Sequence, residues 1–176
     1  MAGDEEEFTR LFKSFYPVLC RFLECLLGGR SSLAQDLAQE SFVRLHTNEW
    51  GNLSSEQARF WLYRVARNLA INEFRRGSMQ NRLVDRVVEA MRPRSRNPEQ
   101  QYETQERQEW VLSMLKILPE DHRTALLLRE QNQLSYREIA EVMEVPETKV
   151  KRDIFRARAK LRERWAQRIR AAGAGA

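Results

Sequence analysis

The stretch from Ser135 to Trp165 reads SYREIAEVMEVPETKVKRDIFRARAKLRERW, and its pattern decides the fold of this part of the chain. Ser135 followed by Glu138 has the spacing of a capping box, which predicts a helix over residues 136–143. Glu144-Val145-Pro146 predicts a turn, after which a longer basic helix follows over residues 147–168. Two helices joined by so short a turn are typical of a helix-turn-helix motif.

The second helix of this motif divides into an apolar stripe and a cationic face. Apolar residues recur at steps of four, three, four and four residues, which predicts one buried stripe made of Val150, Ile154, Ala157, Leu161 and Trp165. The cations must then face elsewhere: Lys149, Lys151, Arg152, Arg156 and Lys160. A DNA-recognition helix needs this division, because the stripe holds the helix on its scaffold while cations reach phosphates and guanine edges. The alternative interpretation is a solvated basic face on an ordinary helix.

The rest of the chain also has a helical pattern. Glycines are scarce, and apolar residues between them recur at three- and four-residue spacing. This pattern predicts further helices at about 4–27, 33–47, 55–76, 98–117 and 120–131. We therefore expect an all-α fold.

A basic run broken by proline, from Met91 to Pro98, divides these helices into two groups. We expect two small helical domains, residues 1–77 and 98–170, joined by a flexible linker over 78–97 and followed by a disordered tail over 171–176. The arrangement of the two domains is left open, because a linker of this type permits several.

The N-terminal half contains two less specific segments. From Asp36 to Leu45 an amphipathic helix is predicted, with Leu37, Phe42 and Leu45 turned inward and Asp36, Gln39, Glu40 and Arg44 outward. The outward face fits either a protein partner or solvent. In residues 55–76 aromatics and arginines interleave, a composition that suits separated DNA strands, although Trp61, Leu62, Val65 and Leu69 have the spacing of core residues.

Composition and charge limit the class of protein. The 176 residues carry 30 Lys and Arg against 25 Asp and Glu, a formal charge of +5 that suits a polyanionic partner. Cys20 and Cys25 lie five apart in a predicted helix, on different faces, so we expect reduced thiols and a cytoplasmic location. No apolar run approaches the roughly 20 residues of a membrane span, and the acidic start has no signal-peptide pattern, so no membrane insertion is expected.

Enzyme motifs are missing from the sequence. His46 and His122 stand without metal-ligand spacing, and no glycine-rich phosphate loop occurs, so we expect no catalytic residue, metal or cofactor. One alternative is an autonomous helix-turn-helix regulator, which needs a dimer interface for two half-sites. A less favoured alternative is a DNA recombinase, which needs an activated nucleophile, and Tyr63 in an apolar run lacks that setting.

Three segments, together and in order, resemble the extracytoplasmic-function (ECF) sigma factors of the sigma-70 family. Residues 36–45 look like the region that grips the polymerase clamp, residues 60–76 like the region that melts and reads the minus-ten element, and residues 118–162 like the minus-thirty-five reader. The resemblance implies a sigma2-like bundle and a sigma4-like helix-turn-helix domain. It also implies a non-catalytic initiation subunit, a monomer when free. Its implied partners are core RNA polymerase (beta-prime clamp helices and beta flap), promoter DNA and an anti-sigma factor.

The resemblance also assigns roles to individual residues. Asn68 would line a pocket for a flipped minus-ten base, with Val65 as its floor and the loop from Trp50 to Leu53 as its lid. The DNA backbone would be held by Arg64, Arg67, Arg75 and Arg76. The minus-thirty-five element would be addressed by Lys149, Lys151, Arg152, Phe155 and Arg156, and the polymerase clamp by Asp36, Gln39, Glu40 and Arg44.

Two residues depart from the family pattern. Asp153 stands where the family commonly has a basic or neutral residue, so it is expected to repel a nearby phosphate. Asn72 replaces a frequent acidic residue. Both departures bear on the promoter sequence that the chain would read.

Overall fold

The computed structural model describes residues 2–80 and 109–173, and within them every regular element is a helix. The elements are α1 (Ala2–Leu26), α2 (Ser31–Arg44), the π-helical turn η1 (Leu45–Glu49), α3 (Ser55–Gln80), a helical segment over 109–116, α6 (Glu120–Glu130), α7 (Tyr136–Met143) and α8 (Glu147–Gly173). The prediction of an all-α fold is confirmed. We call residues 2–80 the N-terminal half and residues 109–173 the C-terminal half.

Several helix ends differ from the predicted ones. Helix α3 continues through Gly77 to Gln80, so the first residues of the predicted linker are helical. Helix α8 runs on to Gly173, so the first three residues of the predicted tail are helical, and residues 174–176 lie outside the described residues. The rest of the predicted linker, residues 81–97, lies outside the described residues, and the helix predicted at 98–117 is described only from residue 109.

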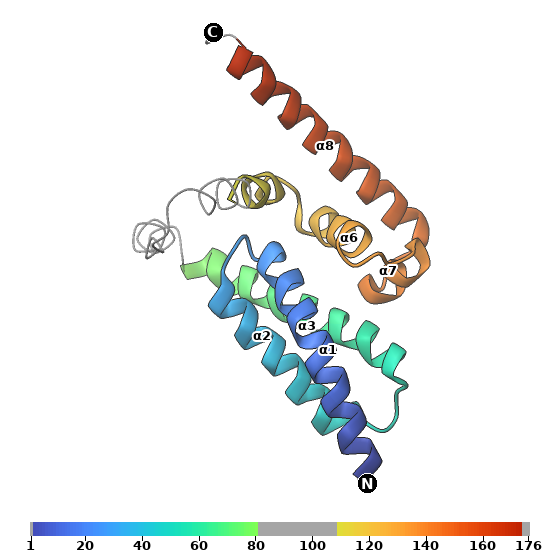
Figure 1. The fold of residues 1–176 in the computed structure, drawn as a ribbon. Coiled ribbons are helices and arrows are strands. Elements are labelled where there is room, and N and C mark those ends of the chain that lie inside the picture. The colour runs from blue at the N-terminus through green and yellow to red at the C-terminus, as the bar shows by residue number, and fades with distance from the viewer. Residues whose placement is uncertain (1, 81–108, 174–176) are drawn as a thin grey trace.

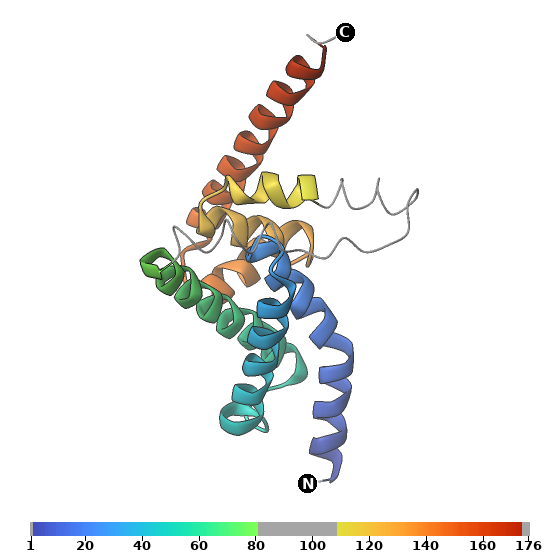
Figure 2. The same ribbon diagram turned by 90° about the vertical axis from the view of Figure 1, so that its left-hand side faces the viewer.

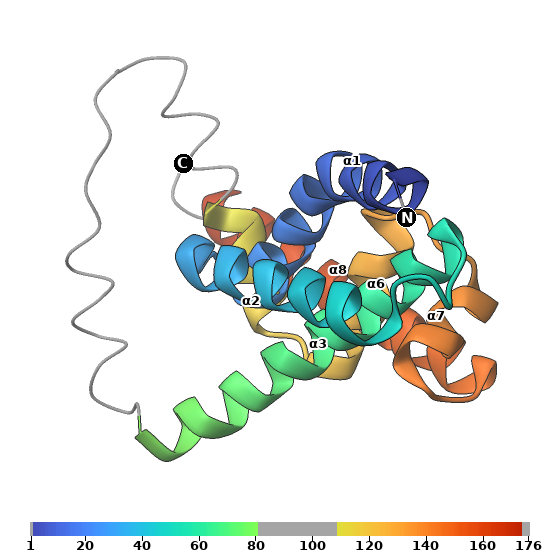
Figure 3. The ribbon, with the colours of Figure 1, turned by 90° about the horizontal axis from the view of Figure 1, so that it is seen from below.

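The N-terminal half is a three-helix bundle. Its largest fully buried side chains include Phe22 of α1, Phe42 of α2 and Leu62 of α3, which come from helix stripes at three- and four-residue spacing. The reversal between α1 and α2 passes through Gly28 and Gly29, whose φ angles of 69° and 92° favour glycine. This turn lets α2 fold back along α1, and α3 then packs against both (Figures 1 and 3).

The C-terminal half contains the predicted helix-turn-helix motif. Ser135 caps α7 through both bonds of a capping box, since its hydroxyl accepts from the Glu138 amide at 3.3 Å and its own amide donates to the Glu138 carboxylate at 2.5 Å. The helix ends at Glu144, whose φ of 55° lies in the left-handed region and turns the chain into α8. The predicted capping box and turn are therefore confirmed.

The apolar stripe of α8 is confirmed only in part. Val150, Ile154 and Ala157 are fully buried against α6 and α7, as predicted. Trp165 is 49 % exposed, because α8 extends beyond the other helices of its half (Figures 1 and 2). Its ring lies against that of Trp110, with 4.8 Å between centroids, but stays about half exposed, so the predicted burial is wrong at the C-terminal end of the stripe.

The two halves pack directly against each other, which answers the question that the sequence left open. Helix α1 contacts α6, and α3 contacts α7, so the buried residues form one continuous cluster. Specific bonds cross the boundary: the Tyr63 hydroxyl donates to the Asn132 side chain at 2.7 Å, and the Arg123 guanidinium donates to the Leu26 carbonyl at 2.7 Å. The described chain is thus closed, with the helix-turn-helix seated beside α3 (Figure 2).

Candidate nucleic-acid interface

The first turns of α8 expose a cationic and aromatic surface. Lys151, Arg152, Phe155 and Arg156 are all exposed, while Val150, Ile154 and Ala157 point into the core. We call these four exposed residues the recognition patch. Phe155 is 68 % exposed, which is unusual for a large aromatic side chain without a partner surface. The patch offers donors for phosphates and base edges together with an apolar group suited to a thymine methyl.

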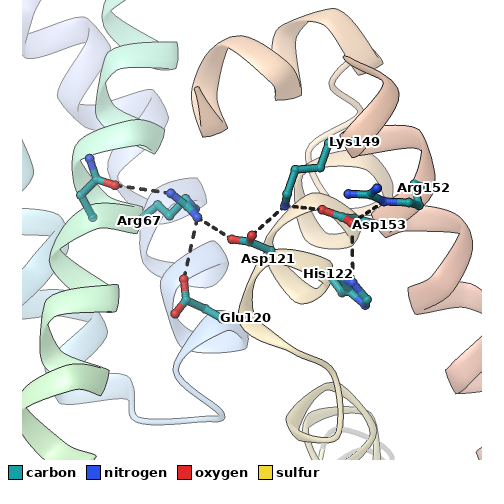
Figure 4. A network of polar contacts seen from close by, with 8 residues as sticks. Arg67, Glu120, Asp121, His122, Lys149, Arg152 and Asp153 are labelled. Carbon is teal, nitrogen blue, oxygen red and sulfur yellow. Dashed lines mark hydrogen bonds and ion pairs between the residues drawn. The ribbon is translucent and has the colours of Figure 1, made fainter. Parts of the chain in front are cut away.

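Lys149 is separated from the recognition patch. Its ammonium donates to Asp121 of α6 at 2.7 Å and to Asp153 of its own helix at 2.6 Å. Burial alone would lower the pKa of Lys149, but these two bonds outweigh it and the pKa is raised. The structure therefore places this predicted DNA contact in a polar network with Asp121 and Asp153, in which only the Asp153 side chain is buried (Figure 4).

Asp153 lies inside that network, and the predicted repulsion of a phosphate is wrong. Its side chain is only 3 % exposed, and its carboxylate lies 3.6 Å from His122 and 3.8 Å from Arg152 in addition to the Lys149 bond. The carboxylate faces the interior of the helix-turn-helix and is neutralised there (Figure 4). The spacing of four residues between Lys149 and Asp153 is the sequence signal for this pair.

Replacing Asp153 by alanine is expected to lower the free energy of unfolding by about 1 to 3 kcal/mol, because hydrogen bonds to charged groups are of this size and Lys149 would lose one. Chemical denaturation of the two proteins measures the difference. Glu163→Ala, an exposed carboxylate on the same helix, is the control and should change stability by less than about 0.5 kcal/mol. An Asp153→Ala variant as stable as this control would show that the carboxylate has no structural role.

The residues assigned to the minus-ten element share α3 but differ in exposure. Asn68 is exposed, and Val65 is half-buried. Arg64 lies 3.5 Å from Glu144 of the C-terminal half, and the Arg67 side chain is only 12 % exposed, bonded to Asp121 at 2.7 Å. Two of the four predicted backbone contacts are thus turned toward the other half of the chain.

The other two predicted backbone contacts lie further along α3. Arg75 and Arg76 are exposed, and Arg76 pairs with Glu73 at 3.1 Å. The end of α3 projects beyond the neighbouring helices (Figure 3). These two arginines are therefore accessible in the closed arrangement.

The loop from Trp50 to Leu53 does not cover Asn68. The Trp50 ring packs on Phe8 of α1 with 5.1 Å between centroids, and its amide donates to the Leu45 carbonyl at 2.7 Å. Asn68 lies thirteen residues beyond Ser55, the first residue of α3, which is about 20 Å along the helix axis. In this conformation the loop is therefore anchored at the other end of the helix, and its role as a lid stays a prediction.

The outward face of α2 matches its prediction. Asp36, Gln39, Glu40 and Arg44 are exposed, and Arg44 pairs with Glu40 at 2.8 Å. Leu37, Phe42 and Leu45 are buried as expected. Val43, which is 53 % exposed, lies three and four residues from Glu40 and Gln39, and the sequence interpretation missed it. Its only signal is that Val43 falls outside the Leu37, Phe42 and Leu45 stripe.

An apolar groove of about 350 Å³ lies between the 109–116 segment and α8, and it was not predicted. Its lining includes Trp110, Met114, Leu161 and Trp165. Arg168 covers the Trp110 ring at 5.1 Å from its centroid. The groove offers a second, apolar contact surface on the C-terminal half.

The recombinase alternative would need an activated nucleophile such as Tyr63. Tyr63 is buried, its hydroxyl is bonded to Asn132, and burial raises its pKa above the ordinary value, so a phenolate nucleophile is disfavoured. In residues 2–80 and 109–173 no group of three or more His, Cys, Asp or Glu side chains is placed to hold a metal ion. The helices of this described part are also too short or too polar to cross a membrane. Cys20 and Cys25 are free thiols.

Comparisons with known proteins agree with the two-part organisation of the chain. The family model of sigma-70 region 2 matches residues 11–79, and that of sigma-70 region 4 matches residues 108–161. RNA polymerase sigma-H factor of Pseudomonas aeruginosa is 37% identical over 135 residues, covering 71% of this chain and 69% of the relative. ECF RNA polymerase sigma factor SigM of Bacillus subtilis is 30% identical over 155 residues, covering 86% of this chain and 91% of the relative.

A solved structure has the same fold. It is the sigma factor RpoE in complex with the anti-sigma factor NepR from Bartonella quintana, with a TM-score of 0.64 and 23% sequence identity. The similarity covers 90% of this chain and 96% of that one. At this identity it concerns the fold alone.

Proposed function

The chain belongs to the ECF group of the sigma-70 family of RNA polymerase sigma factors, and on that premise we propose that its two halves bind different promoter elements. The C-terminal half binds the minus-thirty-five element, and the N-terminal half melts and reads the minus-ten element. The proposed functional units are residues 1–77 and 98–170, joined by 78–97 and followed by the tail 171–176. The chain acts in the cytoplasm as a non-catalytic subunit.

The recognition patch is the observation that carries this proposal. An exposed Phe155 between Arg152 and Arg156, on a helix held down by Val150 and Ile154, suits insertion into a major groove. Lys151 is positioned for the phosphates at the groove edge, although it pairs with Glu147 at 2.7 Å in the free chain. Each of these contacts is available without rearrangement of α8.

The exposed part of α3 supports the minus-ten role. An amide such as that of Asn68 hydrogen-bonds the Watson–Crick edge of an extruded base, and Val65 beside it supplies an apolar surface. Arg75 and Arg76 are accessible to the strand backbone. Because the described residues contain no nucleotide-hydrolysis motif, the free energy for strand opening comes from binding.

The polymerase and regulatory partners are assigned to separate surfaces. We propose that Asp36, Gln39, Glu40, Val43 and Arg44 of α2 bind the beta-prime clamp helices, and that the groove between Trp110 and Trp165 receives the beta flap. An anti-sigma factor is proposed because the similar sigma factor of Bartonella quintana was solved bound to one. A free monomer is proposed, since both DNA elements are read by one chain.

Replacing Glu40 by arginine is expected to weaken binding to core polymerase at least tenfold, because it reverses a charge at the centre of the α2 face and breaks the pair with Arg44. Interferometry with purified core enzyme measures the affinity. Glu56→Arg, the same change at an exposed position of α3, is the control and should bind like the original chain. Equal affinities of both variants would exclude α2 as the clamp contact.

In vitro transcription with core polymerase and a promoter library tests the proposal as a whole. Transcripts that start at a defined subset of promoters and require the chain are the expected result. If the chain were instead an autonomous helix-turn-helix regulator, it would bind duplex DNA as a dimer with nanomolar affinity and without polymerase. That outcome, seen by gel shift together with no promoter-specific transcript, would favour the autonomous regulator.

A further inference from the structure

A polar cavity of about 480 Å³ lies between the two halves of the chain. Its lining comes from α3, the start of α6 and the first turns of α8 (Figure 4). Five cationic side chains line it: Arg67, Arg75, Lys149, Arg152 and Arg156. Three acidic side chains, Glu120, Asp121 and Asp153, also line it, which leaves a formal excess of two positive charges before His122 is counted. The cavity therefore attracts anions.

The acids of the cavity are engaged by two of its cations. Asp121 accepts a bond of 2.7 Å from Arg67 through one oxygen and a bond of 2.7 Å from Lys149 through the other (Figure 4). The bond from Lys149 is the first cause that holds the pKa of Asp121 below its ordinary value. Asp153 accepts a bond of 2.6 Å from the same ammonium, and the Glu120 carboxylate lies 3.9 Å from Arg67. Arg67 and Lys149 thus contact all three acids.

The other three arginines carry the excess positive charge. Arg156 is exposed and forms no ion pair in the described part of the chain. Arg152 is also exposed, and its contact with Asp153, at 3.8 Å, is longer than a hydrogen bond. Arg75 is exposed on α3. Because α3 and α8 lie on either side of the start of α6 (Figure 4), arginines of both helices can bind one anion from two directions.

The start of α6 adds backbone donors to the same cavity. The amides of its first turn, residues 120–122, have no acceptor within the helix, and no side chain caps the helix at Pro119. The first bond of this turn is donated by the Arg123 amide to the Pro119 carbonyl, at 2.9 Å. Uncapped amides and the positive end of the helix dipole stabilise phosphate groups at helix N-termini. Backbone and arginine donors thus line one cavity.

The lining also indicates which anion fits. Among the described residues that line the cavity none is Phe, Tyr or Trp, so it offers little surface on which a nucleobase could stack. Guanidinium groups bind phosphate oxygens in pairs, which gives arginines a preference for phosphate over a simple halide. A chain of two or three phosphates carries oxygens along its whole length and reaches arginines on both helices. The lining therefore favours a short polyphosphate.

We propose that this cavity binds a short polyphosphate, either inorganic or the phosphate chain of a nucleotide, with Arg75 and Arg152 as its contacts from the two halves. The amides at the start of α6 bind the phosphates between these two arginines. This binding is a property of the free chain and goes beyond the promoter contacts proposed above. Arg152 also belongs to the recognition patch, so the polyphosphate and duplex DNA compete for it, a consequence that rests on the proposed function.

Calorimetric titration of the full chain with sodium tripolyphosphate, at fixed ionic strength and without divalent metal, tests the site. Binding of one anion per chain is expected. Arg75→Gln and Arg152→Gln, one from each half, are each expected to weaken this binding at least about fivefold, because each removes one charge-assisted contact. No saturable binding up to about 1 mM tripolyphosphate would overturn the proposal, since the affinity would then be too low for a built site.

Arg76→Gln and Arg164→Gln are the matched controls. Each removes the same charge from the same helix as its counterpart, but from an exposed position outside the cavity lining. Each should weaken binding less than about twofold, because exposed charges at a distance are screened. Similar losses in all four variants would show general attraction to a basic protein and overturn the site. A thermal melt checks that the variants are folded, and the pair on the other helix decides the question if one variant unfolds.

Titrations with ATP and with adenosine separate the two sources of the anion. An affinity for ATP equal to that for tripolyphosphate supports recognition of the phosphate chain alone, and a higher affinity for ATP supports a nucleotide. Adenosine that binds as tightly as ATP would overturn the proposal, since the phosphates would then contribute nothing.

The proposed function is tested independently of this site. A chain that binds tripolyphosphate but directs no promoter-specific transcription with core polymerase keeps the polyphosphate site and loses the proposed function. A chain that directs such transcription but does not bind tripolyphosphate keeps the proposed function and loses the site.

Discussion

Replacing Arg156 by alanine is expected to lower transcription from a minus-thirty-five-dependent promoter roughly 5- to 150-fold, which corresponds to about 1 to 3 kcal/mol for one base-reading arginine. Arg156 is exposed one turn after Arg152 and beside Phe155, on the side of α8 opposite the buried stripe. Because the side chain is exposed, stability should change by less than about 0.5 kcal/mol. In vitro transcription and equilibrium binding of the holoenzyme to duplex promoter measure the loss.

Arg164→Ala is the matched control for this substitution. Arg164 is an exposed arginine on the same helix, two turns beyond Arg156, and its guanidinium donates a long bond of 3.4 Å to the Gln167 side chain. It should change transcription less than about twofold, as expected for a cation outside the groove. Comparison of promoters that differ at a single minus-thirty-five position then separates two roles. A loss confined to one base assigns Arg156 to base reading, and a uniform loss assigns it to a phosphate.

Local patterns in the sequence predicted the elements that depend on neighbours within one helix. The Ser135 and Glu138 spacing predicted the start of α7, and the Val150, Ile154 and Ala157 spacing predicted the buried side of α8. Caps and stripes are set by residues three and four apart, which a sequence displays directly. The exposed residues of the recognition patch follow from the same periodicity.

Long-range contacts account for what the sequence could not predict. Arg67 meets Asp121 across 54 positions, and Lys149 meets it across 28. No periodicity links residues that far apart, so both cations were assigned to DNA alone. Asp153 was misjudged for a related reason: its burial depends on His122 of another helix as well as on its own neighbour Lys149. The burial of Trp165 was predicted incorrectly because α8 extends beyond the helices that cover its first turns.

In the closed packing, the two proposed DNA-binding surfaces differ in how far they are exposed to solvent. The recognition patch of α8 is free in the closed chain, whereas Arg64 and Arg67 are paired with acids of the other half. On the proposed assignment, we expect the upstream element to be contacted before Arg64 and Arg67 leave these acids to bind the minus-ten strand. This order makes strand opening the step that is most sensitive to changes on α3.

Asn68→Ala is accordingly expected to slow strand opening strongly while leaving duplex binding at the upstream element nearly unchanged. Extruding a base costs a few kcal/mol, and the hydrogen bonds from the Asn68 amide to that base offset part of this cost. Without them, we expect at least tenfold less open complex. Permanganate footprinting of unpaired thymines measures opening, and anisotropy with duplex promoter measures binding. Asn68 is exposed and only weakly bonded to Arg67, at 3.5 Å, so the fold should be unaffected.

Asn72→Ala is the comparison variant, because Asn72 is an exposed amide one turn further along α3 whose departure from the family pattern bears on the promoter sequence and not on the flipped-base pocket. If the extruded base is held by Asn68 in particular, Asn72→Ala should open promoters at nearly the original rate. Promoters that carry a mismatch at the minus-ten element should recover most of the opening lost in Asn68→Ala, since a mismatched base costs less to extrude. Equal losses of duplex binding and opening in Asn68→Ala, with no recovery on mismatched promoters, would instead mean that Asn68 contacts the duplex and that α3 contains no pocket for a flipped base.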